Sequence, residues 1–400
     1  MQSHIRSALA LVCVVAAAIP AAWAQRMALN DTGMTACVDP KHHWSSDCAE
    51  SRQDAAEGRD VHDANPDDGV AGFSFRKVCR SGEMAGEGTC PSDPALGTGP
   101  DDWGCVHDNI TQLTWEAKTD DAGLHDGSTY YTNKGGKARD QPGDAAWLKD
   151  ATNAEGLCGA TNWRLPDAFE LQSLVDYGMG APGRVGPFID AKYFPNVRGL
   201  ETAWWTRNEA TFHDKWAWFV GFSVGRVSAI HRFYGTVSAM LVHGTPHSAA
   251  SSPQGQPARA RDRFIPSPDG AQVKDTQTGL VWRRCAEGMS WNNGTQTCEG
   301  AATVFSWKEA LDHAWARRDG GWRVPNIKEL FSIVSLQHSY PAIDPVAFPN
   351  TEWLIGYASS TPVDWSGKTQ VQNVSFGAGT VYPYDSDRWR LRLVRNRGRE

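Results

Sequence analysis

Two arginine–glutamate pairs are the first residues whose types and spacing could support chemistry. Arg164 precedes Glu170, and Arg323 precedes Glu329, by the same interval. A guanidinium beside a carboxylate is one arrangement for acid–base chemistry. However, each glutamate also follows an Asp or Asn by three positions, which is the spacing of a helix capping box. We therefore expect each glutamate to cap a helix, and each arginine to pair with a carboxylate or with backbone carbonyls.

A basic run near the C-terminus offers a different chemistry, the binding of anions. The run consists of Arg388, Arg390, Arg392, Arg395, Arg397 and Arg399. In an extended strand over 389–393, Arg390 and Arg392 would project from one face and the apolar residues between them from the other. Such an arginine ladder suits sulfate or phosphate groups, which accept paired hydrogen bonds. A solvated edge strand followed by a frayed tail is the alternative interpretation.

Three aromatic residues precede this run in a region rich in predicted strands. If their rings are exposed, they could stack on sugars; otherwise they belong to the core. With the arginines they make up the predicted ligand-binding set: Trp365, Tyr382, Tyr384, Arg388, Arg390 and Arg392.

An acidic segment, Asp120, Asp121, His125 and Asp126, has the oxygen ligands that calcium prefers. It lacks the spacing of a calcium-binding loop of the EF-hand type, so we expect a solvated loop, with no metal ion and no other cofactor. The sequence contains no nucleophile elbow, P-loop, dinucleotide fingerprint or zinc-protease motif. We therefore predict no catalytic residues and expect that the protein is not an enzyme.

The N-terminus indicates export. Arg6 precedes an apolar run over 8–18, and Ala22-Trp23-Ala24 fits a signal-peptidase site. Residues 1–24 are thus predicted to be a cleaved signal peptide. No later stretch is apolar for long enough to span a bilayer, so we expect no membrane span in the mature chain. The predicted location is the periplasm, the cell surface or the medium.

Of the nine cysteines, Cys13 lies in the signal peptide, which leaves eight. An even number in an exported protein indicates disulfides. Eight cysteines allow roughly a hundred pairings, and the sequence does not choose among them. Proximity along the chain suggests the disulfides Cys37–Cys48, Cys79–Cys90 and Cys285–Cys298. Cys105 and Cys158 then remain to form a fourth disulfide that closes a long loop.

These residues belong to a sequence that is repeated. The pattern W-R-[LV]-P-x-x-x-E-L occurs at 163–171 and 322–330, and D-x-x-T-x-L-x-W occurs at 108–115 and 275–282. Solenoid repeats have periods of about 20–50 residues, far shorter than this interval. The pattern therefore indicates a duplicated domain.

We predict a first domain over 25–243 with a cysteine-containing N-terminal extension, a linker over 244–262 and a second domain over 263–400. Each copy has the signals of two helices. One follows the W-R-[LV]-P motif, and an earlier one is indicated by Ser306 and Glu309, with a first-copy partner around 144–151. Short strands are predicted elsewhere, among them 216–224, 371–376 and 380–384. We therefore expect an α+β domain that is present twice in the chain.

Both motifs, together with the Cys285-x5-Trp291-x6-Cys298 spacing, resemble the C-terminal domain family named after the Legionella collagen-like (Lcl) adhesin. The resemblance covers nearly all of the mature chain as two tandem copies. It implies a C-type lectin-like fold in each copy, with two helices and a curved antiparallel sheet. Relatives of this kind are surface adhesins that bind sulfated polysaccharides. The chain lacks the calcium-dependent sugar motifs of lectins, so any sugar binding is expected to be independent of calcium.

We therefore predict an exported bacterial adhesin-like protein without catalytic activity, which binds a glycan or a cell-surface partner, with sulfated polysaccharides as one class. One alternative is a structural envelope protein that assembles with protein partners. Another is an enzyme on a fold like that of the formylglycine-generating enzymes. That chemistry needs reactive cysteines in the active site, whereas the cysteines of this chain lie in short loops outside the repeated core. The net charge is −7, and neither half is basic enough for a nucleic-acid-binding protein.

Overall fold

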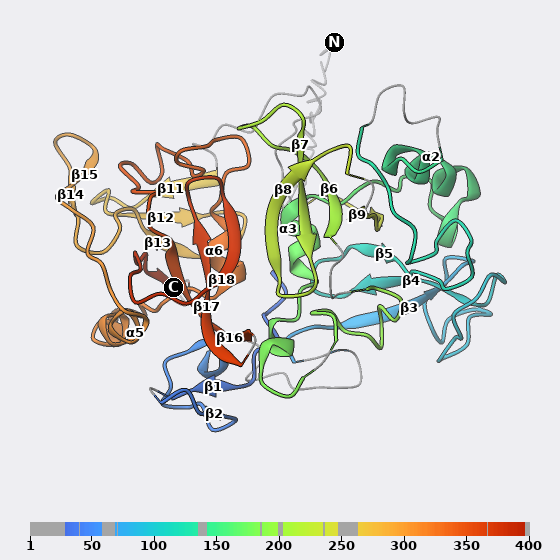
Figure 1. The fold of residues 1–400 in the computed structure, drawn as a ribbon, viewed down its shortest axis with the longest axis horizontal. Coiled ribbons are helices and arrows are strands. Elements are labelled where there is room, and N and C mark those ends of the chain that lie inside the picture. Colours follow the sequence, from blue (N-terminus) through green and yellow to red (C-terminus); the bar gives the residue numbers. More distant parts are fainter. Residues whose placement is uncertain are drawn as a thin grey trace, which may run out of the picture.

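The computed structural model describes residues 29–396, except 40, 58–68, 70, 135–141, 185, 199–202, 235–236, 247–262 and 366. The predicted signal peptide and most of the predicted linker lie outside the described residues, as do Arg397 and Arg399. The described part is an α+β fold dominated by antiparallel strands, and its two halves lie side by side (Figure 1).

Each half contains a small four-stranded antiparallel sheet with the same order of strands. In the first half the order is β3 (Phe75–Cys79), β4 (Trp103–Asp108), β5 (Thr114–Glu116) and β10 (Val242–His243). In the second half it is β11 (Phe264–Pro266), β12 (Gln272–Asp275), β13 (Val281–Arg283) and β19 (Val394–Arg395). The order of strands is thus that of one domain present twice.

The repeated D-x-x-T-x-L-x-W motif forms the hairpin turn of each small sheet. The buried Asp108 carboxylate accepts a hydrogen bond from the Ile110 amide (2.9 Å), and Asp275 accepts one from the Gln277 amide (3.0 Å). Because a carboxylate oxygen replaces a backbone acceptor here, the chain can reverse tightly. The tryptophan that ends each motif then points into the core.

The described residues contain four α-helices, of which capping signals predicted three and the repeat predicted the fourth, around residues 144–151. They are α2 (Ala145–Glu155), α3 (Ala168–Ser173), α5 (Trp307–Trp315) and α6 (Ile327–Ser332). Complete capping boxes begin α3, α5 and α6, and the Asp144 side chain caps α2. The two predicted helices per copy are therefore confirmed.

A seven-stranded sheet runs through both halves (Figure 1). Its order is β16 (Tyr357–Trp365), β17 (Lys368–Ser375), β18 (Thr380–Tyr384), β8 (Arg226–His231), β7 (Trp216–Gly221), β6 (Ala203–Glu209) and β9 (Val237–Ser238). The halves meet where β18 pairs antiparallel with β8, through Val381 and Val227. These two valines occupy equivalent positions of the repeat. The same strand of each copy therefore makes the contact.

The hydrophobic core is shared between the copies. One contiguous buried cluster contains Trp115 and Leu171 of the first copy and Trp282 and Leu330 of the second. At the seam, Phe169 of α3 packs on Phe331 of α6 with ring centroids 4.9 Å apart. A smaller cluster in each copy holds the repeated motif tryptophan, Trp163 or Trp322, and both are buried, as expected of equivalent residues.

The remaining short elements lie in loops. They are β1 (Cys37–Val38), β2 (Trp44–Ser45), β14 (Ser290–Asn292), β15 (Thr297–Glu299) and the one-turn 3-10 helices η1 (Asp54–Ala56), η3 (Leu157–Gly159), η4 (Tyr177–Gly180) and η5 (Arg318–Gly320).

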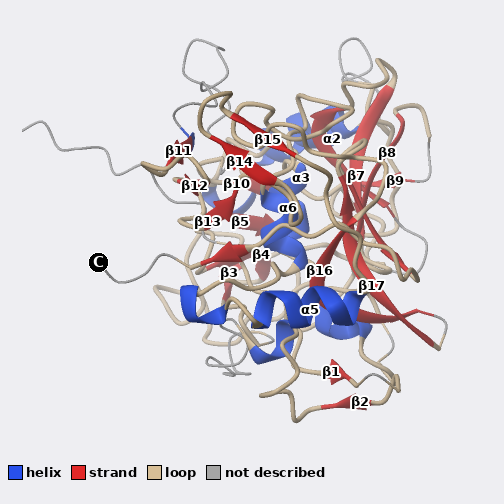
Figure 2. Ribbon diagram, turned by 90° about the vertical axis from the view of Figure 1, so that its left-hand side faces the viewer, coloured by secondary structure: helices blue, strands red, loops and turns tan. Residues whose placement is uncertain are grey.

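Residues 29–57, which we call the N-terminal arm, cross the seam between the copies. The Tyr177 amide of the first copy donates to the Thr32 carbonyl (2.7 Å). In the second copy, the Lys328 ammonium donates to the Asp31 carbonyl (2.6 Å), and the Thr361 hydroxyl donates to the Asp54 carboxylate (2.6 Å). Figures 1 and 2 both show β1 and β2 of the arm next to α5 of the second copy.

Two buried carboxyl groups at this seam have raised pKa values. Burial, reinforced by the neighbouring Asp31 carboxylate, raises the pKa of Asp54 to about 7. Burial likewise raises the pKa of Asp176 to about 7. In the unfolded chain both would titrate near 4. Between about pH 4 and 7 the folded state therefore binds more protons than the unfolded state, and the stabilising contribution of these groups falls as the pH rises.

We expect the mature protein to unfold at a higher temperature at pH 5 than at pH 8. The free energy of unfolding should fall by on the order of a few kcal/mol from pH 5 to pH 8, because one unit of difference between the folded and unfolded pKa corresponds to about 1.4 kcal/mol for each group. Asp54→Asn keeps a hydrogen-bond acceptor for Thr32 and Thr361 but cannot ionise, so it should flatten this pH dependence. Calorimetry of both proteins between pH 4.5 and 8 tests the expectation. Equal slopes for wild type and variant would contradict it.

Candidate functional site

A groove of about 830 Å³ lies between the N-terminal arm and the second copy. Residues 37–53 of the arm contribute one wall, and α5 contributes the opposite wall through the segment 307–312. Residues 369–371 of β17 and residues 384–386, which begin with the last residue of β18, complete the lining. The groove thus combines segments that are far apart in the sequence.

The wall contributed by the arm is held by local cross-links. The Cys37–Cys48 disulfide closes the loop, and Val38 pairs with Trp44 across β1 and β2. The Gln53 side-chain amide then bonds both backbone groups of Val38, at 3.0 Å to the amide and 2.6 Å to the carbonyl. These contacts give a short, mostly exposed loop a defined shape.

Charged groups fasten this wall to α5. The Arg52 guanidinium forms an ion pair with the Asp312 carboxylate and lies 5.0 Å from the centre of the Trp315 ring. The Lys308 ammonium lies 2.6 Å from the second oxygen of Asp312. One carboxylate therefore engages both cations of the groove.

Tyr384 presents an aromatic face to the groove. Its side chain is 59 % exposed, and its ring meets the buried Trp389 ring edge-on, with centroids 6.4 Å apart. The Trp307 indole, which also lines the groove, is fixed by a hydrogen bond to the Ser359 carbonyl (2.8 Å). The groove therefore offers a solvent-open ring beside polar side chains.

The structure separates the other predicted aromatic residues from the groove. Trp365 and Tyr382 are exposed at 39 % and 43 %, but neither lines it. The Arg226 guanidinium of the first copy lies 5.2 Å from the centre of the Tyr382 ring. Arg388 is also exposed and lies two residues beyond the lining residue Ser386. Of the predicted ligand-binding set, only Tyr384 belongs to the groove.

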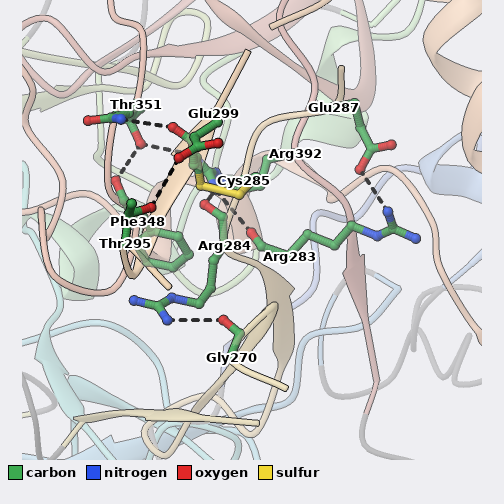
Figure 3. The surroundings of a disulfide bond; sticks show 12 residues. Gly270, Arg283, Arg284, Cys285, Glu287, Thr295, Glu299, Phe348, Thr351 and Arg392 are labelled. Atoms are coloured by element: carbon green, nitrogen blue, oxygen red, sulfur yellow. Dashed lines mark hydrogen bonds and ion pairs between the residues drawn. A yellow bond between two sulfur atoms is a disulfide. The ribbon is translucent and has the colours of Figure 1, made fainter. Parts of the chain in front are cut away.

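The predicted arginine ladder is wrong, because Arg392 is buried at 1 % exposure. Its guanidinium donates to the backbone carbonyls of Arg283 (3.0 Å) and Arg284 and to the Thr351 hydroxyl (2.9 Å). Figure 3 shows Arg392 reaching the backbone beside the Cys285 disulfide. Arg392 thus binds the protein's own carbonyls and is not exposed to an external anion.

Arg390 is likewise occupied within the protein. Its guanidinium donates to the Ala302 carbonyl and to the Glu352 carboxylate. The physical reason is that 389–393 is not an exposed edge strand. Trp389 and Arg390 form isolated bridges to interior segments, and regular pairing starts only with β19.

The structural interpretation of the repeated arginine–glutamate pairs is confirmed. Both Arg164 amino groups donate to the Glu170 carboxylate at 2.7 Å, and both Arg323 amino groups donate to Glu329 at 2.6 Å. Each glutamate also caps the first turn of its helix. Bidentate pairs of this kind fix the W-R-[LV]-P segment to the helix that follows it.

The acidic segment is only partly the solvated loop that the sequence predicts. Asp120 and Asp121 are exposed, whereas His125 is buried between the carboxylates of Glu116 (2.7 Å) and Glu155 (2.8 Å). Burial alone would raise the pKa of Glu116, but the charges of Lys118 and His125 lower it to about 2. In the part of the chain that the structure describes, no group of three or more His, Cys, Asp or Glu side chains could hold a metal ion.

All four disulfides suggested by proximity are present: Cys37–Cys48, Cys79–Cys90, Cys105–Cys158 and Cys285–Cys298.

The duplicated architecture agrees with a comparison of the sequence to protein families. Residues 104–243 and 271–395 each match the Lcl C-terminal domain. The chain belongs to the Lcl C-terminal domain family. The predicted resemblance and its two tandem copies are therefore confirmed. No curated protein and no solved structure matches the chain.

Membership of the Lcl C-terminal domain family suggests an adhesin-like surface protein. The four disulfides fit an extracellular or surface location, because such bonds persist in oxidising compartments. Within the described ranges, none of the helices has both the length and the apolar character needed to cross a membrane.

The wall contributed by the arm was missed by sequence reasoning. The arm precedes both matched Lcl C-terminal domains, so the repeat gives no information about its position. Arg52 and Asp312 are 260 residues apart, and neither stands in a motif. The sequence signal for this wall was the short loop between Cys37 and Cys48, which indicated that the loop is ordered but not which part of the chain it packs against.

Proposed function

We propose that this protein is an exported, adhesin-like surface protein without catalytic activity, and that it binds a glycan in the groove between the arm and the second Lcl C-terminal domain. The observation that carries the proposal is the solvent-open ring of Tyr384 in a groove of about 830 Å³. Grooves of about 300–1,000 Å³ commonly accommodate small ligands. Exposed aromatic rings present an apolar face on which sugar rings can stack.

The polar lining supports a carbohydrate ligand. Thr369, Gln370 and Ser51 supply hydroxyl and amide groups, which both donate and accept hydrogen bonds. Sugar hydroxyls need partners of this kind. The sulfated class implied by the resemblance is less well supported here, because Arg390 and Arg392 are engaged inside the protein.

The proposed absence of catalytic activity is supported by the structural roles of the four residues that most suggest acid–base chemistry in the sequence. Arg164, Glu170, Arg323 and Glu329 are engaged in helix caps and internal ion pairs. We further propose that each copy is C-type lectin-like, since two helices and antiparallel strands of each copy fit that description.

We expect the mature protein, residues 25–400, to retain specific glycans on an array with and without calcium. Tyr384→Ala should weaken binding to the best glycan by roughly tenfold or more, because about 1.4 kcal/mol of stacking is lost. Tyr382→Ala is the matched control, since it removes an exposed tyrosine of the same strand outside the groove. An array without any specific signal, or equal losses in both variants, would argue against the proposal.

A further inference from the structure

We propose that the groove selects a glycan carrying protonated primary amines, such as a de-N-acetylated amino-sugar polymer, over neutral and sulfated glycans. This inference rests on the proposed function and specifies its ligand class. It follows from the balance of charges around the groove.

Carboxylates outnumber cations in the lining of the groove. Five carboxylates contribute: Asp39, Asp47, Glu50, Asp312 and Asp385. The cationic side chains are Arg52 and Lys308, and His42 is the one further basic group. With histidine neutral, the lining carries three negative charges in excess.

Neither cation is directed at a ligand. Arg52 is bound to Asp312 and packs on Trp315, and the Lys308 ammonium lies 2.6 Å from the other oxygen of Asp312. An anionic ligand would have to displace one of these internal contacts. It would also have to approach the four other carboxylates.

Three of the four remaining carboxylates are available to a cation, whereas Asp39 is engaged by two backbone amides and by the His43 imidazole (3.2 Å). Hydrogen bonds from the backbone amides of His43 and Lys41 lower the pKa of Asp39, so it is ionised at neutral pH. Asp47, Glu50 and Asp385 are exposed, and among the described residues their carboxylates form no hydrogen bond or ion pair. Three charged acceptors therefore face solvent around the groove.

An ammonium group on a sugar ring matches both features of this site. Carboxylates accept charge-assisted hydrogen bonds from ammonium groups, and the face of Tyr384 attracts a cation through its π electrons. The pyranose ring itself can stack on the same aromatic face. At longer range, the net charge of −7 favours cationic ligands and disfavours polyanions.

The test uses three oligosaccharides of equal length: a glucosamine tetramer, an N-acetylglucosamine tetramer and a heparin tetrasaccharide. Calorimetric titration of the mature protein at pH 6 should show the glucosamine tetramer binding roughly tenfold or more tightly than the acetylated tetramer. This preference should decrease with added salt, because exposed charges are screened.

Asp47→Asn combined with Asp385→Asn should reduce the preference to within about threefold. The matched control, Asp214→Asn with Asp387→Asn, removes the same charge from exposed sites outside the groove and should leave the preference unchanged. If both double variants reduce it equally, overall charge explains the selectivity and the inference is wrong.

The outcomes separate this inference from the proposed function. Equal binding of both tetramers, with loss in Tyr384→Ala, would retain the glycan-binding groove and overturn the selection for amines. Tighter binding of the heparin tetrasaccharide would overturn it as well. If no oligosaccharide binds and the array is empty, both proposals fail.

Discussion

Replacing Arg392 with alanine should lower the free energy of unfolding by about 3–5 kcal/mol. The substitution removes a large buried side chain and leaves the carbonyls of Arg283 and Arg284 and the Thr351 hydroxyl without their partner. Buried acceptors that lose a donor retain the full cost of desolvation, and the cavity adds to it. Urea denaturation of the mature protein, followed by tryptophan fluorescence, measures the change.

Two further variants make the interpretation specific. Arg392→Lys should rescue little of the loss, because an ammonium cannot reproduce the planar fork of donors that reaches three acceptors. The exposed Arg388→Ala should change the stability by no more than about 0.5 kcal/mol. If Arg392→Ala unfolded at the same urea concentration as wild type, a structural role for this arginine would be excluded.

Separating the two copies should abolish folding of each one. We expect residues 25–246 and 263–400, expressed alone, to be insoluble or to lack a cooperative unfolding transition. Each fragment would expose its part of the shared cluster that contains Trp115 and Trp282. The Lys328 ammonium would also lose its acceptors, the carbonyls of Asp31 (2.6 Å) and Ser173 (2.8 Å).

A cleavable version of the full chain provides the control. A protease site placed within 247–262 should allow the chain to be cut after folding. The two fragments should then co-elute in size-exclusion chromatography and melt together, since the seam does not depend on the covalent connection. A cooperative transition in the isolated fragment 263–400 would contradict the shared-core interpretation.

The local parts of the fold were predictable from the sequence because their determinants are neighbours in the chain. Asp167 and Glu170, like Asn326 and Glu329, satisfy each other's backbone amides within one helical turn. Cys37 and Cys48 are only 11 residues apart, so their pairing follows from proximity. Because the same motifs recur in the second copy, the same reasoning predicts its local structure.

Arg392 shows why the site was predicted less well. The alternation of a strand places its side chain opposite the apolar residues, and an arginine there is expected to face solvent. Whether a buried guanidinium is tolerated depends on which carbonyls surround it. Those carbonyls belong to residues 283 and 284, more than a hundred positions earlier. No local pattern encodes that contact, and the same holds for Arg52 and Asp312 across the groove.

The pairing of β8 with β18 has an evolutionary consequence. Val227 and Val381 are equivalent residues that face each other in antiparallel strands, which is the isologous geometry of a twofold-symmetric homodimer. A single-domain ancestor could have dimerised through this strand, and gene fusion would then have joined the two subunits in one polypeptide. After fusion, one subunit was free to diverge from the other. The arm contacts both copies but forms the groove with the second copy, so the twofold relation between the copies is only approximate and the groove belongs to one of them.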